Sequence, residues 1–375
     1  MMATPSVEIR PVDSRKDWKE FVRFPYRHYR DNPVWVPPLL QDQKVLLDPA
    51  KHPFYRHADV RFFLALKDGR TAGRIAAIVD HKHNEFHSEK TGFFGFFESI
   101  DDFRVAEGLL SSAKRWIADK GMTALRGPVN PSQNEDCGCL MDAYDSPPVL
   151  MMTYNPPYYP MLYERFGLRK IVDLWAYFIE SNQKIPEKLV RVAELLRQRE
   201  RVIVRKVDMK RFDSEVEKIK TIYNNAWSRN WGFVPMTDEE FDHLAKNLKP
   251  VVVPDLGLIA EIDGQPVAFS LTLPDMNQAL IHLKGRLLPF GLLKLLWFQR
   301  KIDTVRIITL GVIHEHQKKG IDSILYLDTW RYAVKKGYRG GEMSWILENN
   351  TMMNRAAEML GGKVYKTYRM YQMEV

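Results

Sequence analysis

The chain has 375 residues, of which 45% are hydrophobic and 27% are charged, and this composition is ordinary for a soluble globular protein with a sizeable core. At roughly 150 residues per domain, the length suggests two domains. The net charge of +8 favours anionic partners, such as a phosphate-bearing cofactor or an anionic lipid. Because the basic residues are dispersed and no helix-turn-helix or zinc signature appears, we expect no nucleic-acid partner.

Targeting segments and metal motifs are also not indicated. The first residues, MMATPSVEIRPVDS, lack the apolar core of a signal peptide, and no apolar run reaches the roughly 18 residues of a spanning helix. The two cysteines, Cys137 and Cys139, are too close for a zinc knuckle and too few for a disulfide framework. We therefore expect a cytoplasmic protein without a metal, in which both thiols are structural or incidental.

The first half of the chain begins with a strand containing EIRPVDS, followed by helices that carry aromatic residues. The stretch FFLALKDGRTAGRIAAIVD predicts a β-hairpin, because Asp-Gly supplies the positive φ that such turns need. A further strand at Gly92–Ser99 and an amphipathic helix at Phe103–Lys120 follow.

A long segment dense in Asn, Gly and Pro comes next, GPVNPSQNEDCGCLMDAYDSPPVLMMTYNPPYY. Ordered loops of this length are uncommon unless they are functional. Asn130 and Asn134, together with Asp136 and Asp142, are candidates to line a polar acceptor site. They are equally well explained as turn formers that bond their own backbone, and the sequence leaves both interpretations open.

The clearest domain boundary lies in IESNQKIPEKLVRVAELLRQRERVIVRKVD. Strand-like Leu174–Ile179 ends there, a charged helix at Pro186–Arg199 follows, and Val202–Val207 begins a new strand. We therefore predict a first domain of residues 1–185, a linking helix of residues 186–200 and a second domain of residues 201–375.

The second half repeats the order of the first. VRKVDMK opens it, LGLIAEIDGQPVAFSLTL predicts another Asp-Gly hairpin, and a strand at Val305–Val312 precedes a helix at Ile321–Lys336. A further strand, a short helix and a final strand close each half. This order predicts an internal duplication with a period of about 190 residues.

The turn before the second-half helix has the composition of an anion site. Backbone N–H groups at a helix N-terminus, together with the helix dipole, can hold a phosphate. Gly320 lets the backbone approach an anion, and Lys318 and Lys319 add positive charge. A carboxylate at Asp322 is unfavourable beside a diphosphate unless it caps the helix. The alternative is a basic surface loop that precedes a capped helix.

The repeated order and this turn resemble the GCN5-related N-acetyltransferase (GNAT) superfamily, in two tandem copies that cover nearly the whole chain. The resemblance implies an α/β (α+β) fold with two GNAT-like domains, each a mixed, mostly antiparallel sheet flanked by helices. It implies acyl-CoA as co-substrate, either acetyl-CoA or a long-chain acyl-CoA. The residues it implies for contact with that co-substrate are Leu310 and Val312 at a bulge of the preceding strand, Gln317, Lys318, Lys319, Gly320, Ile321 and Asp322 in the turn, and Asn350. The family usually has Gly or Ala where Asp322 stands.

A second marker of the family is an Asn followed by a helix with a Tyr and a Gly. In the second half Asn350 and Gly361 match, but Ala357 stands at the tyrosine position. In the first half Asn155 and Tyr163 match, but the glycine turn is missing. We infer one acyl-CoA site in the second half, with a first half that shapes the acceptor site through Asn130, Asn134, Tyr154, Asn155 and Tyr163.

Acid and base candidates follow from the chemistry of amine attack on a thioester, which needs a base to take a proton and an acid for the leaving thiolate. Tyr365 or Tyr368 would replace the missing family tyrosine, although both also fit as packed strand residues. The base candidates are His314, His316, Glu342 and Glu348, and the sequence leaves the choice open. We select Glu348, His314 and Tyr365 as the catalytic candidates.

The stretch LKGRLLPFGLLKLLWFQRKID contains an apolar centre between basic ends, at residues 284–301. It is too short to span a bilayer, and its pattern is typical of a segment that lies on an anionic leaflet. The alternatives are a buried helix or a homodimer contact. We expect a cytoplasmic protein that contacts the inner face of the membrane here, and we leave its oligomeric state open.

The phrases NPVWVPP, HPFYRHAD and GPVNPSQN make the chain similar to a bacterial group of GNAT-type N-acyltransferases. Some members of that group acylate sphingoid bases, as bacterial ceramide synthases do. The resemblance implies N-acyl transfer from acyl-CoA to an amine, with a lipid or sphingoid amine as one acceptor. The alternatives are acetylation of a small polar amine and a non-catalytic acyl-CoA-binding protein.

Overall fold

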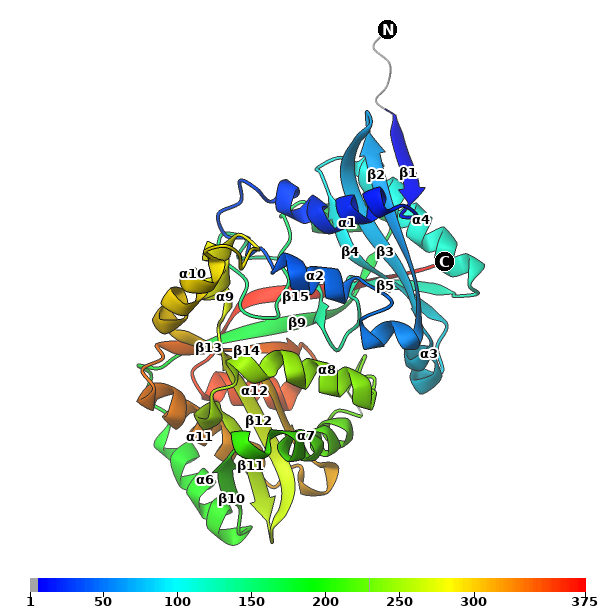
Figure 1. The fold of residues 1–375 in the computed structure, drawn as a ribbon. Helices are drawn as coiled ribbons and strands as arrows, with labels where there is room; N and C mark the ends of the chain where they lie inside the picture. Colours follow the sequence, from blue (N-terminus) through cyan, green and yellow to red (C-terminus); the bar gives the residue numbers. More distant parts are fainter. Residues whose placement is uncertain (1–5, 229) are drawn as a thin grey trace. The chain divides into compact units, whose positions relative to one another are not determined.

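The computed structural model describes residues 6–228 and 230–375, which form two compact units (Figure 1). Unit 1 contains the described residues up to Asp173, together with Leu280–Leu292 and Thr367–Val375. Unit 2 contains Leu174–Ala279 and Leu293–Lys366. Each unit therefore takes chain segments from both halves of the sequence.

Unit 1 is built on a sheet whose parallel pair is β4 and β5, while its other paired strands are antiparallel. Its strands in spatial order are β1 (Val7–Pro11), β2 (Ala58–Lys67), β3 (Arg70–Asp80), β4 (Thr91–Ser99), β5 (Ala124–Gly127) and the end of β15 (Lys363–Glu374). Short strands lie in the long loop: β6 (Val129–Asn130), β7 (Asp136–Cys137) and β8 (Cys139–Leu140). Its helices are α1 (Arg15–His28), α2 (Leu40–Leu46), α3 (His81–His87), α4 (Phe103–Asp119) and α5 (Tyr159–Phe166).

Helices cover both faces of the sheet in unit 1. Side chains alternate along a strand, so neighbouring residues of β2 face opposite sides. Phe63 packs against the core that contains α4, whereas Phe62 makes an edge contact with Phe21 of α1 at 4.9 Å. Helix α4 begins at the N-cap Asp102, and its apolar positions recur at helical spacing, so that one face is fully buried. The residues of that face are Val105, Ala106, Leu109, Leu110, Ala113 and Ile117.

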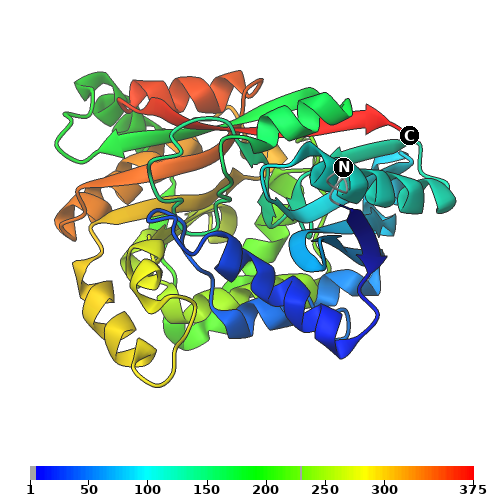
Figure 2. The same ribbon diagram turned by 90° about the horizontal axis from the view of Figure 1, so that it is seen from above.

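Unit 2 repeats this plan, with β13 and β14 as its parallel pair. Its strands in spatial order are the end of β9 (Arg169–Glu180), β14 (Gly340–Leu347), β13 (Thr304–Val312), β12 (Gln265–Pro274), β11 (Gly257–Ile262) and β10 (Ile203–Lys206). Its helices are α6 (Glu187–Arg199), α7 (Phe212–Ala226), α8 (Asp238–Leu248), α11 (Ile321–Lys335) and α12 (Thr351–Met359). Two short helices, α9 (Asn277–Leu280) and α10 (Gly291–Phe298), come after β12 and before β13 in the chain. They belong to the yellow part of the ribbon in Figure 2. Ala268 of β12 packs towards α11, and Phe269 packs towards α7.

The fold class predicted from the sequence is confirmed. Each unit has a mixed, mostly antiparallel sheet flanked by helices, and both Asp-Gly hairpins form. All four turn residues have positive φ, between 48° and 77°. They are Asp68, Gly69, Asp263 and Gly264. The helices after β4 and β13 begin where the sequence predicted.

The last strand of each half of the sequence pairs with a strand of the unit that the other half mainly forms. Leu174–Glu180 of β9 pairs with β14 in unit 2, and residues 371–374 of β15 pair with β5 in unit 1. The predicted limits of the two domains, 1–185 and 201–375, follow the repeat in the sequence, and they stay a prediction about which segments fold independently.

Candidate active site

The parallel strands β13 and β14 separate at a fork in the middle of the sheet of unit 2. Their pairing runs from Thr304 opposite Gly340 to Ile307 opposite Met343, and it stops there. On its other side, β13 has one extra residue at Ile308, because Thr272 pairs with Ile307 and Leu271 with Thr309. An extra residue of this kind bends a strand. The bulge therefore lies at Ile308, two residues before Leu310, whereas the sequence predicted it at Leu310–Val312 itself.

A buried polar network lies at this fork. Arg306 donates from Nε to Ser344 Oγ at 3.0 Å and from Nη2 to Ser344 O at 3.2 Å. Ser344 Oγ donates to one oxygen of Glu342, and the hydroxyl of Tyr365 on β15 donates to the other. Glu342 is fully buried and Arg306 nearly so. A buried charge is tolerated when it is paired and hydrogen-bonded, as these groups are.

The network lies on the face of β14 that points away from α11 and α12. Met343 packs into the cluster that contains Tyr326 and Ala357, and strand alternation places its neighbour Glu342 on the opposite face. The ring of Tyr365 makes an edge contact with Phe178 of β9 at 5.7 Å. Two residues that the sequence analysis considered separately, Tyr365 and Glu342, are thus in direct contact.

The other two catalytic candidates have different surroundings. Glu348 directly follows β14, and its backbone oxygen accepts a hydrogen bond from Asn354 Nδ2 at 3.1 Å. His314 lies in the turn after β13, where its backbone N–H donates to Asn225 Oδ1 at 2.7 Å. Its Nε2 is 2.8 Å from Ser228 Oγ. Their catalytic roles stay predictions.

The turn before α11 supplies an αL glycine and exposed positive charge. Gly320 has a φ of 79° and is the N-cap of α11, while Lys318 has a φ of 63° and an exposed side chain. Lys319 Nζ is 3.4 Å from His316 Nδ1. Gln317 donates from Nε2 to Val312 O at 3.0 Å, so its amide closes the turn instead of pointing outwards. The turn therefore suits an anion chiefly through its lysines and the N-terminus of the helix.

Asp322 occupies the first turn of α11 and is not its N-cap. Burial raises the pKa of its carboxyl, while the backbone N–H groups of Ser323 and of Asp322 itself act in the opposite direction. The carboxylate thus adds negative charge at the N-terminus of α11, where Ser323 N already donates to Gly320 O at 3.1 Å. Lys318, Lys319 and Gly320 fit a diphosphate, and Asp322 competes with one.

The other residues implied for the co-substrate belong to regular structure. Leu310 and Val312 pair with Ser270 and Ala268 of β12. Ile321, the first residue of α11, is buried in the hydrophobic core against which this helix packs. Asn350 is the N-cap of α12, where its side chain accepts from Met353 N at 3.3 Å. Their contact with acyl-CoA stays a prediction.

Two of the predicted acceptor residues in unit 1 bind the backbone of that unit. Asn130 Oδ1 accepts from Phe96 N at 2.6 Å, at a residue of β4 with a φ of 48°. Asn155 is buried and holds Leu140 from both sides, accepting from its N–H at 2.6 Å and donating to its oxygen at 3.2 Å. Asn130 thus bonds a distant strand and not the backbone of its own turn, and an acceptor role for either residue stays a prediction.

The remaining acceptor candidates differ in exposure. Tyr154 accepts from Asn32 Nδ2 at 2.8 Å and donates to Tyr144 O at 3.0 Å. Tyr163 is buried in an aromatic core with Phe94, Phe97, Tyr159 and Tyr371. Asn134 donates from its backbone N–H to Ser132 Oγ at 3.2 Å. A role of these residues in acceptor binding stays a prediction.

A mostly buried carboxylate in unit 1 was not predicted from the sequence. Glu98 Oε2 accepts from the hydroxyls of Tyr29 at 2.6 Å and Tyr159 at 2.8 Å, and Arg74 Nη2 is 3.8 Å from Oε1. Burial raises the pKa of Glu98. Burial and then Arg74 lower the pKa of His28, which lies 3.4 Å from the Tyr159 hydroxyl, to about 4. The available signal was a single carboxylate in the apolar strand TGFFGFFES.

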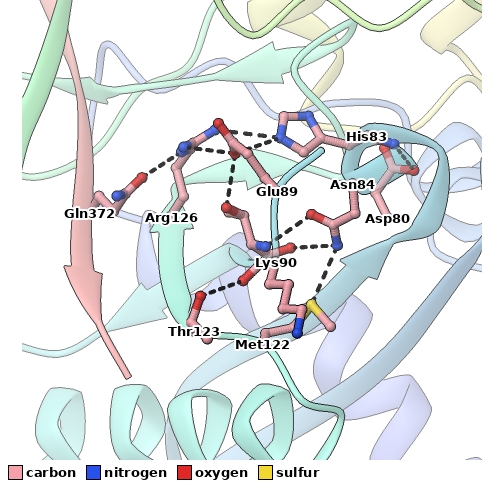
Figure 3. Close-up of polar contacts among 10 residues, drawn as sticks. Asp80, His83, Asn84, Glu89, Lys90, Met122, Thr123, Arg126 and Gln372 are labelled. Carbon is pink, nitrogen blue, oxygen red and sulfur yellow. Dashed lines mark hydrogen bonds and ion pairs between the residues drawn. The ribbon is translucent and has the colours of Figure 1, made fainter. Parts of the chain in front are cut away.

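A third polar cluster joins β5, β15 and the start of β4 in unit 1 (Figure 3). Arg126 contacts Glu89 Oε2 at 3.1 Å and donates to Gln372 Oε1 at 2.7 Å. His83 Nε2 is 3.3 Å from the same Glu89 oxygen, and burial lowers the pKa of His83 to about 4. Because Arg126 and Gln372 come from paired strands, this cluster ties the end of the chain to the sheet.

The chain is similar in sequence to two known proteins and similar in fold to a solved structure. No family model matches the chain. Protein YghO of Escherichia coli (strain K12) is 36% identical over 375 residues, covering 98% of this chain and 95% of that protein. A protein named bacterial ceramide synthase, from Caulobacter vibrioides, is 36% identical over 376 residues, covering 98% and 97%. A solved tandem GNAT protein from the clavulanic acid biosynthesis pathway aligns with a TM-score of 0.57 and 11% identity over 98% of both chains, a likeness of fold.

Proposed function

Because this chain belongs to the family of the Caulobacter vibrioides bacterial ceramide synthase and Escherichia coli Protein YghO, we propose that it is an N-acyltransferase that moves an acyl group from acyl-CoA to an amine. The observation that carries the proposal is the 36% identity, over nearly the full length of both chains, to a protein named ceramide synthase. Within this proposal the acyl group is long and the acceptor is a lipid or sphingoid amine. The tandem GNAT fold supports the reaction class.

In this proposal the diphosphate of acyl-CoA lies at the N-terminus of α11. The positive charge of Lys318 and Lys319 and the close backbone approach at Gly320 suit that group. The carboxylate of Asp322 repels a diphosphate at this position unless it takes up a proton. Burial favours the protonated form of Asp322, because it raises the pKa of this carboxyl.

The reaction chemistry is assigned to the fork between β13 and β14. Acyl-CoA supplies an activated thioester; the amine nitrogen bonds to its carbonyl carbon, and the carbon–sulfur bond breaks. We assign Tyr365 as the acid: its hydroxyl proton, which is donated to Glu342 in the structure, turns towards the leaving sulfur and is transferred to it. Glu348 and His314 remain the candidates for the base that takes the amine proton.

Acyl-chain preference tests the lipid form of the proposal. The full-length protein is incubated with palmitoyl-CoA or acetyl-CoA and with either a sphingoid amine or a small polyamine, and the amide products are measured by mass spectrometry. We expect amide formation with the pair of long-chain substrates. If acetyl-CoA and the polyamine react while palmitoyl-CoA does not, the lipid form is wrong and acetyl transfer to a small amine replaces it.

Calorimetry with CoA tests the binding turn separately from the reaction. Gly320→Glu should abolish binding, because it adds a carboxylate and a side chain at the N-cap. Asp322→Ala should tighten binding, because it removes a carboxylate from the first turn of α11, beside the diphosphate. If Asp322→Ala and Gly320→Glu both bind CoA like the wild type, the diphosphate lies elsewhere. Binding without any amide product would favour a non-catalytic acyl-CoA-binding protein.

A lipid acceptor also implies a place for the protein. Within residues 6–228 and 230–375, none of the helices combines the length and the apolarity needed to cross a bilayer. Within this proposal the protein takes a peripheral position at the inner face of the membrane.

A further inference from the structure

The segment Lys284–Lys301 exposes an unusual concentration of apolar side chains. Leu288 is 79% exposed, Phe290 is 68% exposed and Leu293 is 65% exposed. The large apolar residues exposed here are Leu288, Phe290, Leu292, Leu293, Leu296 and Trp297. Elsewhere in the described ranges, no stretch of ten residues exposes more than two such side chains. A concentration of this kind marks an interaction surface.

The segment holds this conformation through contacts at its base. Gly285 has a φ of 75°, and a Cβ at this residue would lie 2.6 Å from the ring of Tyr26 and 2.9 Å from Pro38 O. Its oxygen accepts from Leu40 N at 3.0 Å. Further along, Leu292 N donates to Leu287 O at 2.8 Å. These contacts anchor the part of the segment that belongs to unit 1, up to Leu292.

Helix α10 of this segment, labelled in Figure 1, is apolar around most of its circumference and has Lys294 as its one charged residue. A helix of this composition is normally buried in a protein core or in a membrane. In α10 only Gly291 is buried. Its eight residues give a length of about 12 Å, which is too short to cross a bilayer but sufficient to lie in its interface.

The charge around the apolar residues restricts what can cover them. Five basic residues accompany them: Lys284, Arg286, Lys294, Arg300 and Lys301. No Asp or Glu occurs between residues 276 and 302. A second copy of the same surface would present the same cations, and like charges oppose such a contact. An occupant with an apolar interior and an anionic surface has the complementary pattern.

We propose that Lys284–Lys301 docks the protein on an anionic lipid bilayer. The apolar side chains enter the boundary between head groups and acyl chains, and the basic side chains contact the head-group phosphates. Trp297, with Lys301 Nζ 5.2 Å from its ring, has the amphipathic character of residues at membrane interfaces. This inference rests on the proposed function only for its purpose, which is access to a lipid amine.

Vesicle flotation of the full-length protein tests the docking. Vesicles of phosphatidylcholine alone are compared with vesicles that also contain phosphatidylglycerol, at low and high salt. We expect the wild type to bind the anionic vesicles and to be released by salt. The double variant Phe290→Ser, Trp297→Ser should lose affinity for these vesicles by about tenfold or more. The double variant Arg300→Gln, Lys301→Gln should lose about fivefold for each cation on anionic vesicles.

Two exposed residues of α6 provide matched controls. Leu195→Ser removes an apolar side chain that is also more than half exposed, and Lys188→Gln removes an exposed lysine. Both should bind vesicles like the wild type, and all variants should keep the thermal melting point. Wild-type protein that ignores anionic vesicles, or double variants that bind as well as the controls, would overturn the proposal.

Two further measurements distinguish membrane docking from a dimer contact and from the proposed enzymatic function. If the wild type is a dimer that Phe290→Ser, Trp297→Ser dissociates, and vesicles are not bound, the surface is a contact between copies and the proposal fails. Amide formation in detergent micelles should be retained by the surface variants. If no variant forms amide while vesicle binding still depends on this surface, the proposed function fails and the docking stands.

Discussion

The hydroxyl of Tyr365 and the carboxylate of Glu342 meet although the strands that carry them, β15 and β14, are not paired with each other in the sheet. From the sequence, Tyr365 also fitted as a packed strand residue, and Glu342 was one of four candidates for the base. The structure places both in one buried network with Arg306 and Ser344. A half-buried hydroxyl held by a fully buried carboxylate is suited to proton transfer.

Tyr365→Phe tests this assignment. It removes the proton and keeps the ring that packs on Phe178, so we expect kcat to fall by about 10²-fold or more with KM nearly unchanged. Steady-state kinetics with acyl-CoA and an amine measure the effect, and Tyr338→Phe in the same unit serves as the control. Equal kcat values for the two variants would mean that Tyr365 is only a packed strand residue.

His83 should make stability depend on pH. Its ordinary pKa is 6.5, and burial and then His87 lower it to about 4 in the folded protein, although Glu89 acts in the opposite direction. Between these values the unfolded state binds more protons, so the free energy of unfolding should fall as the pH drops from 6.5 to 4. Asp255, whose pKa is lowered from 3.8 to about 2, contributes only below that window.

Thermal melts of the wild type and of His83→Gln at pH 7 and pH 5 measure this contribution. The variant should lose less stability than the wild type between the two pH values, whatever its stability at pH 7. His28, with the same direction of shift, remains in both proteins and cancels in the comparison. Equal losses in the two proteins would show that His83 is not responsible.

At the scale of elements, the junction between β13 and α11 was predicted with the correct order and boundaries. Its packing was not predicted. A Cβ at Gly320 would lie 2.3 Å from Leu196 Cδ1, so the linking helix α6 packs directly against the N-terminus of α11. Asp328 of α11 also pairs with Arg197 of α6 at 2.8 Å. Gly320 is thus required by its positive φ and by the lack of space for a side chain beside Leu196, whether or not an anion binds here.

Gly320→Ala should therefore destabilise the protein more than an ordinary αL glycine does. The positive φ costs about 1–2 kcal/mol for alanine, and the contact with Leu196 adds roughly 1 kcal/mol or more. Gly337→Ala is the matched control, because its φ is 86° and nothing lies within 4 Å. Chemical denaturation measures both. Adding Leu196→Ala should remove the excess cost, and equal costs for the two glycines would contradict the packing argument.

At the scale of the whole molecule, the exchange of final strands is the main feature that the repeat did not reveal. Residues 371–374 of β15 pair with β5, and Tyr371 is fully buried in the aromatic core of unit 1. Loss of a buried aromatic side chain alone costs about 3–5 kcal/mol. Without this strand β5 also becomes an exposed edge that promotes aggregation.

A fragment of residues 1–185 should therefore be unstable when it is expressed alone. We expect it to become soluble when residues 186–375 are expressed with it, because that fragment supplies the missing strand. Co-purification and circular dichroism measure the outcome. A fragment 1–185 that melts cooperatively on its own, near the melting point of the intact protein, would show instead that the predicted domain limits are also folding limits.

Local sequence determined much of this protein. The Asp-Gly turns, the amphipathic helices α4 and α11 and the repeated order follow from residues close together in the chain, because turn chemistry and periodicity act over short distances. The same holds for the positive charge at the N-terminus of α11 and for the apolar segment with basic ends. The sequence therefore indicated the fold class and the place of a candidate anion site.

Tertiary structure decided what depends on distant residues. Glu342 and Tyr365 meet only because β14 and β15 bring them together, and strand pairing alone reveals that β9 and β15 serve opposite units. Asn130 was compatible with an acceptor site or with a turn that bonds its own backbone, and only the structure shows its bond to Phe96 of β4. The solvent exposure of the apolar side chains between Leu288 and Trp297 likewise depends on what the rest of the chain leaves uncovered. These are long-range contacts, and no local pattern encodes them.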